Sequence, residues 1–337
     1  MKNILCLGGA GFIGSNFVDY IFKNTDWNIT VVDLLNYRGR LDNFSDEVWR
    51  EHLNYINGKK DSRFRFIYGD ICDFHLMNKL FKENEYVVGF AAESHVDRSI
   101  FSSAPFIRSD VEGVQILLDV LKQNKHIEKF IHFSTSEVYG TAQYEPMDEQ
   151  HPLLPASPYA ASKCGGDRLI YSYQNTFDVP TTIVRPFNQY GPQQHAENLI
   201  PKCITSILNG KKIPIFGNGE AMRDFVFVKD TCEAILTLLN ADNNEIKHKV
   251  FNIATGIATS TLDIARKIVK YMGQTEDECI SFVDSRLGEV NKHIGCNKKM
   301  KSVFNWETKT TLDCGLLLTI EWYKSHLPWI ANRKMYI

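Results

Sequence analysis

Short apolar runs alternate with longer amphipathic segments over the first half of the chain. The apolar runs end at glycine or polar residues, which is typical of strands, and the segments between them carry a helical repeat. The predicted strands are 3–7, 29–32, 64–68, 86–92, 130–133 and 181–184. Strands that alternate with helices through residue 135 predict parallel βαβ units. We therefore expect the α/β class, with a doubly wound parallel sheet.

The pattern changes after about residue 190, where loops and short strands become more frequent. Such segments include 198–201, 212–219 and 222–228, followed by a strand at 250–254 and a helix at 262–271. We expect residues 1–190 to form a dinucleotide-binding domain that carries the catalytic residues. Residues 191–337 are then a smaller α/β substrate-binding domain, with segments of the two domains interleaved.

Two long helices, predicted near 105–123 and 160–177, have apolar faces that one sheet does not fully cover. Contact between two copies of the chain would cover these faces, which favours a homodimer. Ordinary packing of both helices on the sheet is the alternative.

Composition narrows the function classes. The chain is 44% hydrophobic and 23% charged, and its net charge of −2 gives no basic surface for nucleic acid or an anionic membrane. No apolar run is long enough to span a bilayer, and the N-terminal run is too short for a signal peptide. The eight cysteines are scattered singly, without metal-binding spacing. We expect a cytoplasmic protein with reduced thiols and no metal.

A glycine-rich turn follows the first strand and opens a helix. Gly8 permits the tight turn, Gly11 lets the backbone approach a pyrophosphate, and Gly14 lets helix and strand pack closely. The next strand ends at Asp33, whose carboxylate suits ribose hydroxyls and repels a 2′-phosphate, so the expected cofactor is NAD. The predicted cofactor contacts are Gly8, Gly11, Phe12, Ile13, Gly14, Asp33, Asp70, Ile71, Ala91, Tyr159 and Lys163.

Two of these inferences have alternatives. Arg38 and Arg40 lie near Asp33 and could hold a 2′-phosphate, which would favour NADP. Asp70 could bind the adenine amino group, or it could cap the helix that begins near Phe74.

The stretch 130–163 carries the candidate chemistry. Tyr159 and Lys163 are four residues apart at the start of a helix, which places phenol and ammonium on one face. The ammonium can lower the pKa of the phenol and make it a usable base. Thr135 and Glu137 follow the preceding strand, at the edge where open α/β sheets bind ligands. A base, a hydroxyl and a carboxylate are thus predicted to face one substrate.

The glycine turn, the tyrosine–lysine pair and the strand-end sequence STSE together resemble the extended short-chain dehydrogenase/reductases, which have a Rossmann fold. The segments AESHVDRSI, SPYAASK, NQYGP, ENLIP and RDFVFVKD resemble the nucleotide-sugar 4,6-dehydratases of the dTDP-glucose type within that family. The motifs recur in order from residue 8 to about residue 290, so the resemblance covers most of the chain.

The resemblance implies that bound NAD is reduced and reoxidised within one turnover. Tyr159, assisted by Lys163 and Thr135, would take the proton of the sugar 4-hydroxyl while hydride leaves C4. The 4-ketone acidifies the C5 proton, which Glu137 would remove. The 6-hydroxyl then leaves as water, and hydride returns to C6. The implied product is a 4-keto-6-deoxy sugar nucleotide made from, for example, dTDP-glucose, UDP-glucose or UDP-GlcNAc.

Ser136 departs from the dTDP-glucose pattern, in which an aspartic acid at this position protonates the leaving hydroxyl. A serine hydroxyl is too weak an acid for that role, although it could relay a proton while Glu137 acts as base and then as acid. GDP-mannose 4,6-dehydratases have Thr-Ser-Glu at this place, and so do UDP-glucuronate decarboxylases. The alternatives are therefore a decarboxylase or a nucleotide-sugar 4-epimerase and, in another class, a non-catalytic NAD-sensing protein.

The resemblance also implies the substrate contacts. Asn188 matches a substrate-contacting asparagine, Asn198 and Leu199 would lie beside the nucleotide, and two arginines would clamp the diphosphate. The predicted substrate-binding residues are Ser94, His95, Asn188, Asn198, Leu199, Pro214, Phe216, Arg223 and Arg286.

Overall fold

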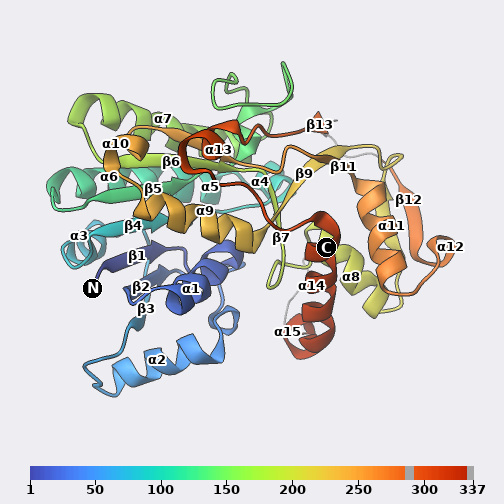
Figure 1. Ribbon diagram of the computed structural model, residues 1–337, viewed down its shortest axis with the longest axis horizontal. Helices are drawn as coiled ribbons and strands as arrows, with labels where there is room; N and C mark the ends of the chain where they lie inside the picture. The colour runs from blue at the N-terminus through green and yellow to red at the C-terminus, as the bar shows by residue number, and fades with distance from the viewer. Residues whose placement is uncertain (285–291, 332–337) are drawn as a thin grey trace.

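The computed structural model describes residues 1–284 and 292–331. Figure 1 shows a wide sheet between layers of helices, with a smaller lobe beside it. Every strand pairing in this sheet is parallel. In spatial order its strands are β10 (Val250–Ile253), β6 (Thr181–Pro186), β5 (Lys129–Phe133), β4 (Tyr86–Gly89), β1 (Asn3–Leu7), β2 (Asn28–Asp33) and β3 (Phe64–Tyr68). The strand order reverses between β1 and β4, the position at which such sheets bind ligands.

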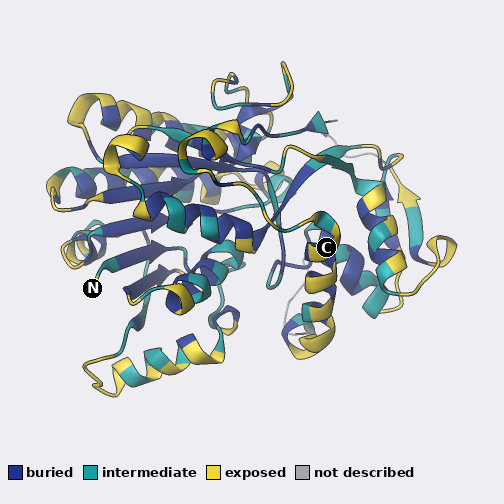
Figure 2. Cartoon of the chain, viewed as in Figure 1, coloured by how far each residue is buried: buried dark blue, intermediate teal, exposed yellow. Residues whose placement is uncertain are grey.

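Helices cover both faces of this sheet, and Figure 2 shows the strands as the buried layer between them. One buried apolar cluster includes side chains of α1 (Phe12–Asn24), α2 (Asp46–Ile56), α9 (Val228–Asn240) and α13 (Lys298–Phe304). The cluster on the other face includes α3 (Phe74–Phe81), α6 (Val114–Gln123) and α7 (Pro158–Phe177). Burial on both faces explains why the strands read as continuous apolar runs. The predicted α/β class with a doubly wound parallel sheet is confirmed.

The smaller lobe is built from short strands and helices around a third apolar cluster. Its strands are β7 (Asn188–Tyr190), β8 (Ile213–Phe216), β9 (Met222–Phe227), β11 (Ala258–Ser260), β12 (Ile280–Val283) and β13 (Lys292–His293). Its helices are α8 (Leu199–Leu208), α11 (Thr261–Tyr271), α12 (Glu276–Cys279), α14 (Leu312–Ser325) and α15 (Leu327–Ala331). Between these segments the chain returns to the large sheet through α9 and β10, so the two parts are interleaved.

Three elements differ from the sequence-based expectation. The strand expected at 86–92 ends at Gly89. Gly89 pairs with Leu7, the last residue of β1, and the chain then turns away from the sheet at Gly8, so β4 has no further partner on this side. The helix expected at 105–123 is α5 (Ala104–Ile107), a π-helical turn η2 (Arg108–Gly113) and α6. Residues 198–201, expected among the loops and short strands, contain the first turn of α8.

The other short elements lie at the edges of these layers. They are α4 (Val96–Phe101), α10 (Asn243–Ile246) and the 3₁₀ turns η1 (Leu41–Asn43) and η3 (Ser136–Tyr139). Within the described ranges, the helices lack the combination of length and apolarity that crossing a bilayer requires.

A buried ion pair joins α7 to β6 behind the cavity described below. The Arg185 guanidinium donates to the Asp167 carboxylate over 2.9 Å, and the two side chains are 2% and 0% exposed. Arg185 also donates to the hydroxyl of Tyr139, which donates to Asn252 on β10. This chain of hydrogen bonds links α7 to two strands and to the turn η3.

We expect Asp167→Asn to destabilise the fold by about 3–5 kcal/mol, because it leaves the buried Arg185 charge uncompensated. Glu276→Gln is the matched control. It breaks a 3.0 Å pair with Arg266 in which both side chains are about half exposed, and should cost less than about 1 kcal/mol. Urea unfolding of the two variants and the parent measures both values. A loss in Asp167→Asn no larger than in the control would show that the buried pair is not a major stabilising contact.

Candidate active site

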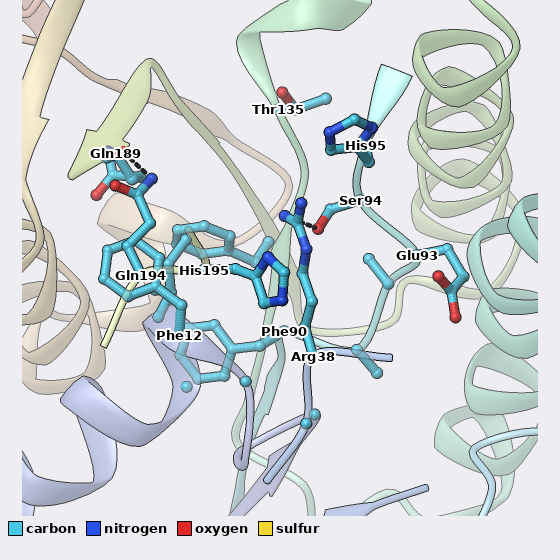
Figure 3. Close-up of a pocket in the computed structure, with 18 of the residues that line it drawn as sticks. Phe12, Arg38, Phe90, Glu93, Ser94, His95, Thr135, Gln189, Gln194 and His195 are labelled. Atoms are coloured by element: carbon cyan, nitrogen blue, oxygen red, sulfur yellow. Dashed lines mark hydrogen bonds between the residues drawn. The ribbon is translucent and has the colours of Figure 1, made fainter. Parts of the chain in front are cut away.

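A cavity of about 510 Å³ opens at the carboxyl ends of the central strands and reaches the smaller lobe. Figure 3 shows how side chains from the large sheet and from loops of the second lobe converge on it. Predicted site residues that line it are Gly8, Gly11, Phe12, Ile13, Gly14, Asp33, Asp70, Ile71, Ala91, Ser94, His95, Thr135, Ser136, Glu137, Tyr159, Lys163, Asn188, Asn198 and Leu199. Residues far apart in the sequence are thus brought to one space.

Four predicted substrate contacts are placed differently. Pro214 and Phe216 lie on β8, outside the lining of this cavity. Arg223 on β9 is also outside the lining, but its charge lowers the pKa of Glu137. Arg286 lies outside the described residues.

The glycine turn has the geometry of a dinucleotide cradle. Gly8 has φ +73°, and a Cβ there would lie 2.4 Å from the backbone nitrogen of Ala91. A Cβ on Gly14 would lie 2.5 Å from the Gly8 carbonyl oxygen, so neither position accepts a side chain. No side chain caps the first turn of α1 at Gly11, which leaves its N–H groups to a phosphate in the cavity. These features fit NAD.

Asp33 both shapes this cradle and faces the cavity. One carboxylate oxygen accepts from the backbone N–H of Ala10 and the other from Leu35, over 2.9 and 2.8 Å. The arginines considered for a 2′-phosphate are already bound to protein groups. Arg38 donates to Ser94 and Glu197, and Arg40 pairs with Asp42. These contacts favour NAD over NADP.

Asp70 does not cap the following helix, so that alternative is wrong. The N-cap of α3 is Asp73, whose carboxylate accepts from the N–H of Leu76. Asp70 instead accepts from Arg108 over 2.9 Å at the edge of the cavity.

Four of the five predicted catalytic side chains meet at the end of β5. They belong to Thr135, Glu137, Tyr159 and Lys163. Lys163 is 2% exposed, and its Nζ donates to the carbonyl of Phe133 over 2.8 Å. Burial raises the pKa of Tyr159, the nearby Asp110 charge raises it further, and a hydrogen bond with Thr135 lowers it. The charge of Lys163 is not among the main causes of this shift, so its role in making Tyr159 a usable base stays a prediction. A phenol in a poorly solvated cavity beside a carboxylate is hard to ionise.

Glu137 follows Thr135 within the turn η3. Burial raises its pKa, and the positive charge of Arg223 opposes that rise. A carboxylate with a raised pKa is a stronger base and, once protonated, holds its proton nearer to neutral pH. Ser136 is 3% exposed and lines the same cavity beside it.

Sequence reasoning missed several lining residues that come from distant segments. Tyr37, Glu93, His195 and Glu197 line the cavity, as does Trp329 from the C-terminal helix α15. Glu197 lies within the segment ENLIP quoted above, whose acid was a usable signal. Glu93 likewise lies within the segment AESHVDRSI, whereas Tyr37, His195 and Trp329 have no such local pattern. Within residues 1–284 and 292–331, histidine, cysteine and acidic side chains form no group that could hold a metal ion.

A doubly wound sheet with a glycine turn, an Asp at the end of β2 and a tyrosine–lysine pair beside the cradle defines the extended short-chain dehydrogenase/reductase class. The chain belongs to the family described as GDP-mannose 4,6 dehydratase, whose model matches residues 5–318. This match confirms the predicted nucleotide-sugar 4,6-dehydratase family and the lyase reaction class.

Individual relatives agree with this assignment. The chain is 39% identical to the low-salt glycan biosynthesis protein Agl12 of Haloferax volcanii, over 95% of this chain and 98% of that protein. It is 36% identical to a dTDP-glucose 4,6-dehydratase of an Actinoplanes species, over 97% and 99%. The crystal structure of DesIV, a dTDP-glucose 4,6-dehydratase from Streptomyces venezuelae with NAD bound, superposes with a TM-score of 0.89. It is 31% identical, with 99% and 100% of the two chains covered.

The pKa of Glu137 predicts a pH dependence. The predicted role of Glu137 as a base requires the ionised carboxylate, so we expect kcat to fall as pH drops through its pKa, which burial raises above the ordinary glutamate value. Arg223→Leu removes the charge that lowers this pKa, so the acid limb of kcat at saturating substrate should move to higher pH. Arg266→Leu, at an exposed pair, should leave the limb in place. An unmoved limb or one at lower pH in Arg223→Leu would show that this limb does not report Glu137.

Proposed function

We propose that this enzyme binds NAD and a hexose nucleotide in one cavity and converts the sugar to its 4-keto-6-deoxy form with loss of water. The observation that supports this most directly is that Thr135, Glu137, Tyr159 and Lys163 line the same cavity as the glycine turn. NAD is the cofactor, and it supplies a hydride acceptor that later returns the hydride, together with positive charge on its oxidised ring.

The first step is oxidation at C4 of the sugar. Tyr159 accepts the proton of the 4-hydroxyl while hydride leaves C4. The Thr135 hydroxyl donates a hydrogen bond to the Tyr159 oxygen. The buried Lys163 ammonium supplies positive charge at the end of β5. Because burial raises the pKa of Tyr159, positive charge near its hydroxyl would favour the ionised form that can act as the base.

The second step is loss of water across C5 and C6. The new C4 carbonyl makes the C5–H acidic, and Glu137 takes this proton. The 6-hydroxyl needs a proton to leave as water, and Ser136 is too weak an acid to supply it. We propose that Glu137 gives its newly acquired proton to the leaving oxygen. Hydride would then return to C6, and a proton from water, relayed by the Glu137 carboxylate, would add at C5. Tyr159 gives the proton of the 4-hydroxyl to solvent, which completes the 4-keto-6-deoxy sugar.

Tyr159→Phe tests the first step. The variant should bind NAD like the parent but turn over at least about 10²-fold more slowly, because it lacks the base. Loss of substrate is followed by mass spectrometry, and NAD content is measured after gel filtration. Tyr271→Phe, which removes an exposed hydroxyl bound to Asp313, is the control. Parental turnover in Tyr159→Phe would refute the assignment of the base.

We propose that the nucleotide lies against the smaller lobe, where Asn188, Asn198 and Leu199 line the cavity. Arg223 and Arg286 remain our candidates for binding the diphosphate, and Pro214 and Phe216 remain our candidates for packing against the nucleobase. We also propose that the dinucleotide domain is 1–190 and the substrate domain 191–337, with α9 and β10 as the interleaved segments. Relatives named as dTDP-glucose and UDP-glucose 4,6-dehydratases favour a pyrimidine nucleotide.

A panel of dTDP-glucose, UDP-glucose, UDP-GlcNAc and GDP-mannose, followed by mass spectrometry, tests the reaction and the substrate together. We expect one pyrimidine sugar nucleotide to lose the mass of water. Loss of carbon dioxide from UDP-glucuronate would indicate a decarboxylase, and an unchanged mass with a new sugar configuration would indicate a 4-epimerase. NAD binding without turnover of any sugar would favour the non-catalytic alternative.

We further propose a cytoplasmic homodimer. Apolar side chains on α4, α5 and α7 are exposed, namely Ile100, Phe101, Ile107 and Tyr171. The eight cysteines are all free thiols, which suits a reducing compartment. Sedimentation of the parent and of a Phe101→Glu variant measures whether each protein is a monomer or a dimer. A parent that sediments as a monomer would rule out the dimer.

A further inference from the structure

Three consecutive residues, which begin three positions after the end of β2, each hydrogen-bond to the cavity wall. We call Asn36–Arg38 the strap. The amide of Asn36 donates to Glu93 over 2.7 Å, and the hydroxyl of Tyr37 donates to Glu197. Arg38 donates to Ser94 and to Glu197, over 3.3 Å in each case. The strap therefore joins the loop after β4 to the loop before α8.

Glu197 is the point at which these contacts converge. Its carboxylate lies 3.7 Å from ring nitrogens of His95 and His195, in addition to its bonds with the strap, and its side chain is only 12% exposed. The ring of Tyr37 packs between cationic and aromatic groups. The Arg98 guanidinium lies 3.6 Å from its centroid, and the His195 ring lies 5.3 Å away. Charge-assisted bonds in such a poorly solvated place are stronger than exposed ones.

The strap occupies a particular position between the two ligand regions. It follows Asp33, the proposed ribose contact, by three residues, and its partner Glu197 immediately precedes Asn198, a proposed substrate contact. The strap, Ser94 and Glu197 all line the cavity. Figure 3 shows Arg38 extended toward Ser94, with His195 close to it. A few side-chain bonds thus connect the part of the cavity next to Asp33 with the part next to Asn198.

The proposed reaction makes a demand that the strap can meet. The hydride taken from C4 must return to C6 of the same sugar, so the reduced cofactor has to stay in place through loss of water. We propose that the strap, held by Glu197, retains the cofactor throughout the turnover, and that Tyr37 and Arg38 are positioning residues for it. This inference rests on the proposed function for its use of NAD.

Tyr37→Phe tests the inference because it removes one hydroxyl and keeps the ring. Holoenzyme is loaded with NAD, passed through gel filtration, and followed for cofactor release. We expect Tyr37→Phe to lose NAD at least roughly tenfold faster than the parent, because the loss of one hydrogen bond to a charged group has an effect of this size. Activity without added NAD should fall, and excess NAD should restore it. Tyr271→Phe, which loses an equivalent bond to Asp313 outside the cavity, should behave like the parent.

Asn36→Ala provides a second variant, which breaks the contact with Glu93 and leaves Glu197 untouched. It should also release NAD faster and respond to excess NAD. Unchanged NAD release in both variants would overturn the inference. So would a raised KM for the sugar nucleotide with unchanged NAD release, because the strap would then serve the substrate.

Release of NAD is measured without turnover, so it separates this inference from the proposed reaction. A parent that retains NAD but leaves every sugar nucleotide unchanged would overturn the reaction alone. A parent that retains no NAD would overturn both.

Discussion

The close approach of the glycine turn to the neighbouring strand is the constraint on which the site depends. β1 and β4 pair only as far as Leu7 and Gly89, and Gly8 then passes so near to Ala91 that no Cβ fits. This contact ends β4 early and frees the following loop to line the cavity. It also aims the first turn of α1 into the same space. A side chain at Gly8 would push β1 and β4 apart at the edge of the sheet where the cavity lies.

Burial has a second effect, on the chemistry of the groups that line this space. Tyr159 and Glu137 both have raised pKa values, and in each case loss of hydration is the main cause. Two ionisable groups beside Tyr159 are themselves buried and held by the fold. Lys163 is fixed by a backbone carbonyl, and Asp110 by the hydroxyls of Ser162 and Ser109. The same low polarity that makes these groups hard to ionise makes each one sensitive to a charge brought in with a ligand.

Local sequence was enough for those parts of the site that a short segment determines by itself. The glycine turn, the end of β2 at Asp33 and the helical spacing of Tyr159 and Lys163 each depend on residues that are close in sequence, so their patterns predicted the local structure. The α/β class followed from the alternation of apolar runs. The contact of Tyr37 with Glu197 joins residues 160 positions apart, and no periodicity encodes it. Likewise, β10 resembles any short strand until its pairing with β6 places it in the large sheet.

Ser136 shows how the fold limits the mechanism. Where an aspartic acid precedes the glutamate, one carboxyl group can protonate the leaving oxygen while the other takes the C5 proton. In the reaction proposed here, one carboxyl group does both. For a single group, the two transfers must occur in sequence at nearby atoms, and its pKa must allow it to hold the proton in between. Burial of Glu137 raises that pKa, and the charge of Arg223 opposes the rise. In the proposed mechanism, burial and the charge of one arginine together set the proton affinity of the single carboxyl group that serves as both base and acid.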